Sequence, residues 1–248
     1  MASVSQTASA RPLPGLFERN GVVDKYFYFA MSLLIAAIVV SGFSRTVDQN
    51  LFHAAIPRPP LLWVHGATFS LWVVFFIFQS ALVRTRNVKI HRTTGWFGVG
   101  LAAFMVPLGA TTAVVMARFD TKVLHQKGAD AFLIEPFYDM VAFAVCAGLG
   151  ILWRKKPELH RRLLFIATCA LLDAAFGRFD YIFNHDLYFV CLDAVILLGV
   201  ARDLLVNKRI HRVYLTALPL LIAAQWFIVY TWRGNAGWWL RIADKIIG

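Results

Sequence analysis

The chain has 248 residues, of which 59% are apolar and 16% are charged, and its mean hydropathy is +0.62. A soluble domain is about 45–50% apolar and about 25% charged, so this composition excludes an ordinary soluble domain. A net charge of +11 would suggest a nucleic-acid partner in a soluble protein. Here the positive charge lies in short segments between apolar blocks, which is the topology signal of membrane proteins, and we expect no nucleic-acid partner.

Residues 1–25 are polar and lack a short apolar core with a cleavage site, so we expect a cytoplasmic tail and no removable signal peptide. Seven apolar blocks follow, each close to the ~20 residues that a membrane-spanning helix needs. The predicted spans are Tyr26–Phe43, Leu61–Val83, Trp96–Ala117, Leu133–Trp153, Arg162–Phe179, Leu187–Leu205 and Val213–Trp232. The sequence therefore predicts an all-α fold, a polytopic bundle of seven transmembrane helices over 26–233.

The distribution of Lys and Arg predicts the orientation of this bundle. Most of the 25 Lys and Arg residues lie in the first tail and in segments 84–92, 154–162 and 202–212. Cytoplasmic loops carry such an excess, so we expect the N-terminus inside and the C-terminus outside. The first helix is then an anchor, and the other six form three hairpins. In residues 234–248 the tryptophans fall on one side of an expected helix and the cations on another. This is the pattern of an amphipathic helix that lies in the membrane interface.

Three inner turns end alike, in His91-Arg92, His160-Arg161 and His211-Arg212, each pair opening an apolar span. Cations at a helix N-terminus oppose the helix dipole, so helix stability does not explain them. An Arg beside the membrane gains about 1 kcal/mol from anionic lipid. We therefore expect these six residues to contact lipid phosphate or another anion. In the alternative interpretation, the three histidines converge on a metal or an anionic ligand.

Two of these elements carry a resemblance. His91-Arg92-Thr93-Thr94-Gly95 after the second span, and Leu159-His160-Arg161-Arg162-Leu163 opening a later one, resemble the HRxxG and LHRRL-type elements of a family of uncharacterised bacterial multi-pass membrane proteins. The resemblance covers roughly the second to the fifth span. It implies a location in the bacterial inner membrane.

Four ionisable side chains in four predicted spans lie at similar depths, between ~6 and ~10 Å from the outer ends of their helices. They are His65, Asp139, Asp173 and Asp193. An Asp at the centre of a bilayer costs about 2.5–3.5 kcal/mol, and such residues usually face the interior of a bundle or a water-filled cavity. The sequence therefore predicts a polar pocket for a small ligand in the outer half of the bundle.

Three further residues are expected to support this pocket electrostatically. Arg178 is the nearest candidate partner for the aspartates, and Glu135 lies at the outer end of the fourth span. Asp180 is seven residues from Asp173, which would place both on one face of a continuous helix.

Three interpretations of the pocket remain open. In the first, its residues form structural ion pairs between hairpins. In the second, His65, Asp139, Asp173 and Asp193 bind a divalent metal such as zinc, iron or manganese. Asp173 and Asp193 would then be catalytic in a metal-dependent membrane enzyme. In the third, protonatable aspartates serve a proton-coupled carrier.

Haem b is a variant of the metal interpretation, with His65 as one axial ligand. The second ligand would come from an outer loop, from His53, His125 or His185. No CxxCH element is present, so covalent attachment of haem is excluded. The sequence itself identifies no cofactor.

Overall fold

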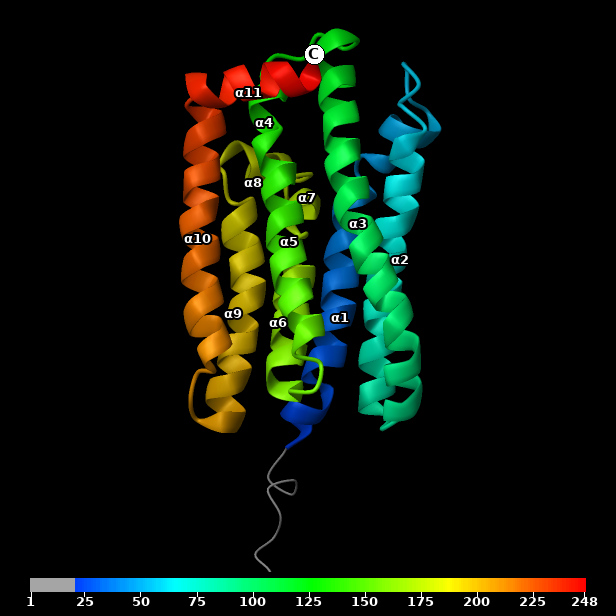
Figure 1. The fold of residues 1–248 in the computed structure, drawn as a ribbon, viewed down its shortest axis with the longest axis vertical. Helices are drawn as coiled ribbons and strands as arrows, with labels where there is room; N and C mark the ends of the chain where they lie inside the picture. Colours follow the sequence, from blue (N-terminus) through cyan, green and yellow to red (C-terminus); the bar gives the residue numbers. More distant parts are fainter. Residues whose placement is uncertain (1–20) are drawn as a thin grey trace, which may run out of the picture.

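The protein is described by a computed structural model over residues 21–248, and all its regular elements in that range are helical (Figure 1). The first 20 residues of the predicted tail lie outside the described part. The elements in chain order are α1 (Val22–Phe43), the π-helical turn η1 (Asp48–Phe52), α2 (Leu61–Arg84), α3 (Val88–Lys122), α4 (Ala129–Phe132), α5 (Ile134–Leu152), α6 (Pro157–Cys169), α7 (Asp173–Phe176), α8 (Asp180–Asn184), α9 (Tyr188–Asn207), α10 (Arg212–Arg233) and α11 (Gly237–Ile247).

Five helical segments in the described range are long and apolar enough to cross a membrane. They are Val22–Phe43, Leu61–Arg84, Val88–Lys122, Ala129–Leu152 and Arg212–Arg233. Their arrangement side by side is that of an integral, multi-pass membrane protein, as the composition predicts (Figure 1). The other two predicted spans correspond to α6 with α7, and to α9. The first is interrupted, and α9 carries Asp193, Arg202 and Asp203.

The bundle has two chemically different ends. The α2–α3, α5–α6 and α9–α10 connections lie together at the lower end in Figure 1, with the three His-Arg pairs, and we call this the His-Arg end. Helix α11 lies across the opposite end, which we call the α11 end. The two helices of each expected hairpin pack against each other, α2 on α3, α5 on α6 and α9 on α10.

Helix α3 is longer than predicted and begins at Val88, not at Trp96. The segment between these residues contains no proline, and its only glycine is Gly95. Polar residues in this segment can therefore continue the helix beyond the apolar block. His91 consequently lies in the first turns of α3.

The predicted single span Arg162–Phe179 is wrong, because the helix breaks after Cys169. The Leu172 amide donates to the Cys169 carbonyl at 2.9 Å, and the Ala175 amide donates to the Leu172 carbonyl at 3.0 Å. These bonds span three residues instead of the four of an α-helix, so the regular ladder ends. Asp173 begins α7, whereas Asp180 begins α8 and is exposed. The expectation that Asp173 and Asp180 share one helical face is therefore wrong.

Close packing against α1 accommodates this break. A Cβ atom added to Gly42 on α1 would overlap the backbone carbonyl of Ala175 on α7. A glycine at this position therefore lets the two backbones touch. The contact places the first residue of α7, Asp173, inside the bundle, where it is 2% exposed.

The amphipathic segment after α10 forms α11, and its apolar side packs on protein. Trp239, Ala243 and Ile247 are buried, and the Trp239 indole donates to the Ala131 carbonyl at 2.9 Å. Arg118 on α3 donates to the Ile246 and Ile247 carbonyls. Helix α11 thus covers this end of the bundle by packing on α3, α4 and α5.

Candidate functional site

Three carboxyl groups lie buried in the half of the bundle nearer α11. Glu135 and Asp139 come from α5 and Asp173 from α7, and they are 5%, 7% and 2% exposed. The side chains of Asp139 and Asp173 lie close enough together for each to affect the ionisation of the other. The Tyr188 hydroxyl donates to Oε2 of Glu135 at 3.1 Å. Two of the predicted residues, Asp139 and Asp173, are therefore brought together.

The contact between Asp139 and Asp173 constrains their charge. Their Oδ1 atoms are buried and have no hydrogen-bond partner among the described residues. No ion pair in residues 21–248 involves either carboxyl group or Glu135. Two ionised carboxylates in contact repel each other, and burial raises the cost of both charges. The arrangement can therefore hold a proton between the two groups.

Asp193 on α9 is half-buried and has a different environment. Its Oδ1 accepts a hydrogen bond from Nε2 of Gln225 on α10 at 3.2 Å. The nearby Tyr138 hydroxyl donates to the Leu221 carbonyl at 3.4 Å. In the described part of the chain no hydrogen bond joins Asp193 to Asp139 or Asp173. Its catalytic role, predicted with that of Asp173, stays a hypothesis.

His65 lines a recess of about 620 Å³ at the α11 end. Its ring stacks on Phe69, with 4.1 Å between the ring centroids, and its Nδ1 atom is buried without a hydrogen-bond partner among the described residues. The walls are mostly apolar and come from α2, α3, α4, α5, α8 and α10. The recess has the size of a typical small-molecule site and offers one imidazole to a ligand.

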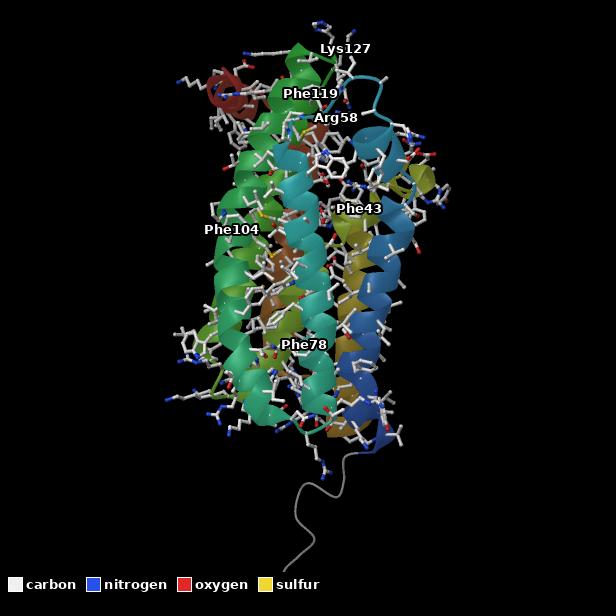
Figure 2. The ribbon with its side chains drawn as sticks, turned by 90° about the vertical axis from the view of Figure 1, so that its right-hand side faces the viewer. Phe43, Arg58, Phe78, Phe104, Phe119 and Lys127 are labelled. Atoms are coloured by element: carbon white, nitrogen blue, oxygen red, sulfur yellow. The ribbon has the colours of Figure 1, made fainter. Side chains whose placement is uncertain are left out.

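Charged side chains border the recess. Asp120 is held by Nη1 of Arg58 at 2.7 Å, and Arg58 also packs over Phe119. Figure 2 shows Arg58, Phe119 and Lys127 at this end of the bundle, far from Phe78 near the other end. Arg233, another lining residue, pairs with Asp186 at 2.6 Å. The recess therefore combines an apolar body with a charged rim.

The recess adjoins the buried carboxyl groups. Leu133 and Pro136 line it and flank Glu135 along α5. Phe183 also lines it and stacks on Tyr188, the donor to Glu135, with 6.2 Å between centroids. A ligand in the recess would thus contact residues on both sides of Glu135 in the chain, and the ring that packs on its hydrogen-bond donor.

Arg178 does not form the ion pairs expected from the sequence. Its Nε donates to Oγ1 of Thr46 at 2.9 Å, its guanidinium lies 3.6 Å from the centre of the Phe43 ring, and Nη1 donates to the Ala174 carbonyl. Among the described residues no carboxylate lies within ion-pair distance of Arg178, and no cationic side chain lies within ion-pair distance of Asp180. The exposed Asp180 therefore does not support the pocket directly.

The geometry gives the metal interpretation of this pocket no support. In residues 21–248 no three side chains among His, Cys, Asp and Glu gather as metal ligands. The haem variant needs a second histidine beside His65. His53, His125 and His185 do not line the recess that His65 lines.

Sequence reasoning missed a buried charge network at the His-Arg end. Arg162 on α6 and Asp203 on α9 are both fully buried and are joined by two hydrogen bonds, 2.9 and 2.5 Å. Arg202 donates to Asp203 at 2.6 Å and pairs with Asp24 on α1. The only sequence signal was opposite charges at the ends of separate apolar blocks.

The three His-Arg pairs are not equivalent. The rings of His91 and His160 meet edge to face, with 6.2 Å between their centroids. His211 instead caps α10, accepting a hydrogen bond from the Val213 amide at Nδ1. Arg161 pairs with Glu158 at 2.7 Å, whereas Arg92 and Arg212 are exposed.

Comparison of the chain with protein-family models, with curated proteins and with solved structures found no match.

Proposed function

We propose that this chain is a proton-coupled carrier of the bacterial inner membrane that takes a small amphipathic ligand into the recess beside His65. The observation that carries the proposal is the proximity of two buried carboxyl groups, those of Asp139 and Asp173, without a cationic partner among the described residues. Intramembrane carboxyl groups without a cationic partner are a recurring feature of proton paths. Interrupted membrane helices are likewise common at the binding sites of transporters, and Asp173 begins the segment after such a break.

The recess supplies the ligand side of the proposal. Its volume of about 620 Å³ suits a molecule of drug size, and its walls are mostly apolar. The unpartnered Nδ1 atom of His65 would bind a polar group of that molecule. Glu135, next to the recess, would connect a bound ligand to the proton shared by Asp139 and Asp173.

The proposed topology has seven membrane crossings, with α6 and α7 forming one interrupted crossing and α9 another. The N-terminus is inside, so the His-Arg end faces the cytoplasm and α11 lies at the outer surface. The exposed Arg92 and Arg212 then face anionic headgroups of the inner leaflet. A labelling experiment with membrane-impermeant thiol reagents tests this, because Cys placed at Lys127 should react in intact cells and Cys placed at Arg209 should not.

Infrared spectroscopy of the purified protein tests the shared proton. The carbonyl band of protonated carboxylic acids is expected in the wild type near neutral pH, and Asp139→Asn and Asp173→Asn should each remove the part of it that the shared proton contributes. Asp180→Asn is the matched control, because Asp180 is exposed, and it should leave the band unchanged. A wild type without such a band would contradict the proposal.

Coupling is tested in liposomes containing a pH-sensitive dye, with a panel of amphipathic solutes added outside. At least one solute should drive proton entry, and His65→Ala and Asp173→Asn should each abolish that entry. A solute that enters without protons, or at the same rate in Asp173→Asn, would show that the recess binds a ligand but that the carboxyl pair is not coupled to it.

A further inference from the structure

Polar side chains from three helices lie close together at the His-Arg end, away from the proposed carrier site. His91 lies on α3 and His160 on α6, and their rings are 6.2 Å apart between centroids, with an angle of 77° between the ring planes. Gln79 on α2 lies beside His91, because its side chain contacts Thr94, one helical turn from His91 on α3. Gln79 and His91 lie on either side of the α2–α3 connection, and helix packing brings His160 to them.

The hydrogen bonds of His160 leave one ring nitrogen for a ligand. Nδ1 lies 2.9 Å from the carbonyl oxygen of Gly150 on α5. A carbonyl only accepts hydrogen bonds, so Nδ1 of His160 must carry the hydrogen, and the neutral ring presents the lone pair of Nε2. A ring N–H that donates to a backbone carbonyl is also how proteins orient histidines that bind metals.

The orientation of Gln79 follows from a similar argument. Thr94 Oγ1 donates to the Ile90 carbonyl at 2.8 Å, which uses its single hydrogen. It can therefore only accept from Gln79, whose Nε2 lies 2.7 Å away. The bond to Ile90 favours this orientation of the amide, in which Oε1 of Gln79 is buried with no partner among the described residues.

His91 completes the group, since its Nδ1 atom is also buried without a partner in the described part of the chain. Buried polar atoms in folded proteins nearly always have a hydrogen-bond partner, so two such atoms on neighbouring residues require an explanation. A shared ligand that accepts lone pairs from nitrogen and oxygen would satisfy both. A phosphate group would not, because Oε1 of Gln79 would oppose its negative charge.

We propose that His91, His160 and Oε1 of Gln79 bind a single d-block cation, for which Zn²⁺ is the test ion. Imidazole nitrogen favours zinc and copper over magnesium and calcium. A metal–nitrogen bond of about 2.0–2.1 Å, extended by about 1.2 Å to each ring centre, puts the centroids roughly 5 Å apart in a tetrahedral site and roughly 6.5 Å apart in a linear one. The observed 6.2 Å is wider than a tetrahedral site requires, so the two rings must approach each other by roughly 1 Å when Zn²⁺ binds.

The site is distinct from the pocket expected at the α11 end. Its ligands are two histidines and an amide oxygen. It therefore does not conflict with the absence, in residues 21–248, of three His, Cys, Asp or Glu side chains gathered as metal ligands. It also explains why only two of the three His-Arg pairs converge. His211 uses its Nδ1 lone pair to accept the Val213 amide and belongs to a different contact.

The test is a Zn²⁺ titration of the untagged, full-length protein in detergent, followed by calorimetry and by elemental analysis after dialysis. One Zn²⁺ per chain is expected. His91→Ala and His160→Ala should each weaken binding by roughly 100-fold, since removing a ligand costs at least as much as removing a residue that orients one. His211→Asn is the matched control and should bind as the wild type does, because Asn also caps a helix.

Gln79→Glu keeps the proposal testable if the alanine variants fail to fold. A carboxylate in place of the amide oxygen should tighten Zn²⁺ binding at neutral pH by roughly tenfold, and zinc X-ray absorption should show two imidazole ligands. A wild type that retains no zinc, or His91→Ala and His160→Ala proteins that fold and bind zinc like the wild type, would overturn the proposal. A Soret band that both variants lose would overturn it in favour of haem iron.

Discussion

Arg162 on α6 holds Asp203 on α9 through two hydrogen bonds, from Nε to Oδ2 at 2.9 Å and from Nη2 to Oδ1 at 2.5 Å. Both side chains are completely buried. The remaining Arg162 nitrogen, Nη1, donates to the carbonyl and the carboxylate of Glu158. This pair ties the α5–α6 hairpin to the α9–α10 hairpin, and it ranks among the strongest polar contacts of the bundle because charged, two-point hydrogen bonds exceed neutral ones.

Breaking this pair on one side should destabilise the protein strongly. Arg162→Met leaves the Asp203 carboxylate buried with less compensation, and such losses cost about 3–5 kcal/mol. The double variant Arg162→Met/Asp203→Leu should cost less than the two single changes added together, because residues in direct contact are coupled. Unfolding in mixed micelles with increasing denaturing detergent measures both quantities.

Arg209→Ala is the control for the Arg162 prediction. Arg209 is an exposed residue at the same end of the bundle, and its removal should change stability by less than about 0.5 kcal/mol. An Arg162→Met protein as stable as Arg209→Ala would show that the buried pair does not hold the two hairpins together.

A second prediction concerns the donor to Glu135. Tyr188 is 1% exposed, and its hydroxyl donates a hydrogen bond of 3.1 Å to the Glu135 carboxyl group. Tyr188→Phe keeps the ring but leaves the buried carboxyl group without this donor, which should cost about 1–3 kcal/mol of unfolding free energy. Tyr181→Phe is the matched change, because Tyr181 is 68% exposed. Equal stability of the two variants in thermal unfolding would rule out a stabilising role for this hydrogen bond.

The lengths of the apolar blocks made most of the fold predictable. Helix α10 covers Arg212–Arg233 where the sequence predicts Val213–Trp232, and α2 agrees equally well. A helix in a membrane must satisfy its own backbone, so a long apolar block leaves few alternatives. The break after Cys169 was not predictable, because no proline or glycine lies between that residue and Gly177. It depends on the contact between Gly42 and Ala175, which joins distant parts of the chain.

The candidate site was predictable in depth but not in pairing. Counting along helices placed Asp139 and Asp173 in one layer, and they do meet. Asp193 lies in the same layer, yet the rotation of α9 directs it to Gln225. Helix rotation follows from side-chain packing, which a count of residues does not contain. For the same reason, the partnership of Arg162 with Asp203 could not be inferred from two charges 41 positions apart.

Gly42 permits the helix break, and this gives a third prediction. In Gly42→Ala the new Cβ would overlap the Ala175 carbonyl, a backbone group that cannot move without shifting α7. Overpacking of this kind costs about 1–3 kcal/mol. Gly100→Ala on α3 is the matched control, since nothing lies within 4 Å of the added atom. Ala is a better helix former than Gly by up to about 1 kcal/mol, so Gly100→Ala should be neutral or slightly stabilising. If Gly42→Ala behaves likewise in thermal unfolding, α1 and α7 do not touch as described.

The last prediction concerns pH and the turn before α10. Burial, and next to it the positive charge of Arg162, lowers the pKa of His211 below 6.5, against the opposing effect of Asp203 and Glu158. The folded state therefore favours the neutral ring, whose Nδ1 accepts the Val213 amide at 3.2 Å. Because the unfolded chain binds the proton more readily, this contribution to stability is complete above about pH 6.5 and is lost as the pH falls through the folded-state pKa.

The measurement compares unfolding at about pH 7.5 with unfolding at about pH 5.5, an interval in which histidine titrates. The wild type should be less stable at the lower pH. His211→Asn retains a capping side chain without the titration, so its loss over the same interval should be smaller. An equal loss in both proteins would assign the pH dependence to other groups.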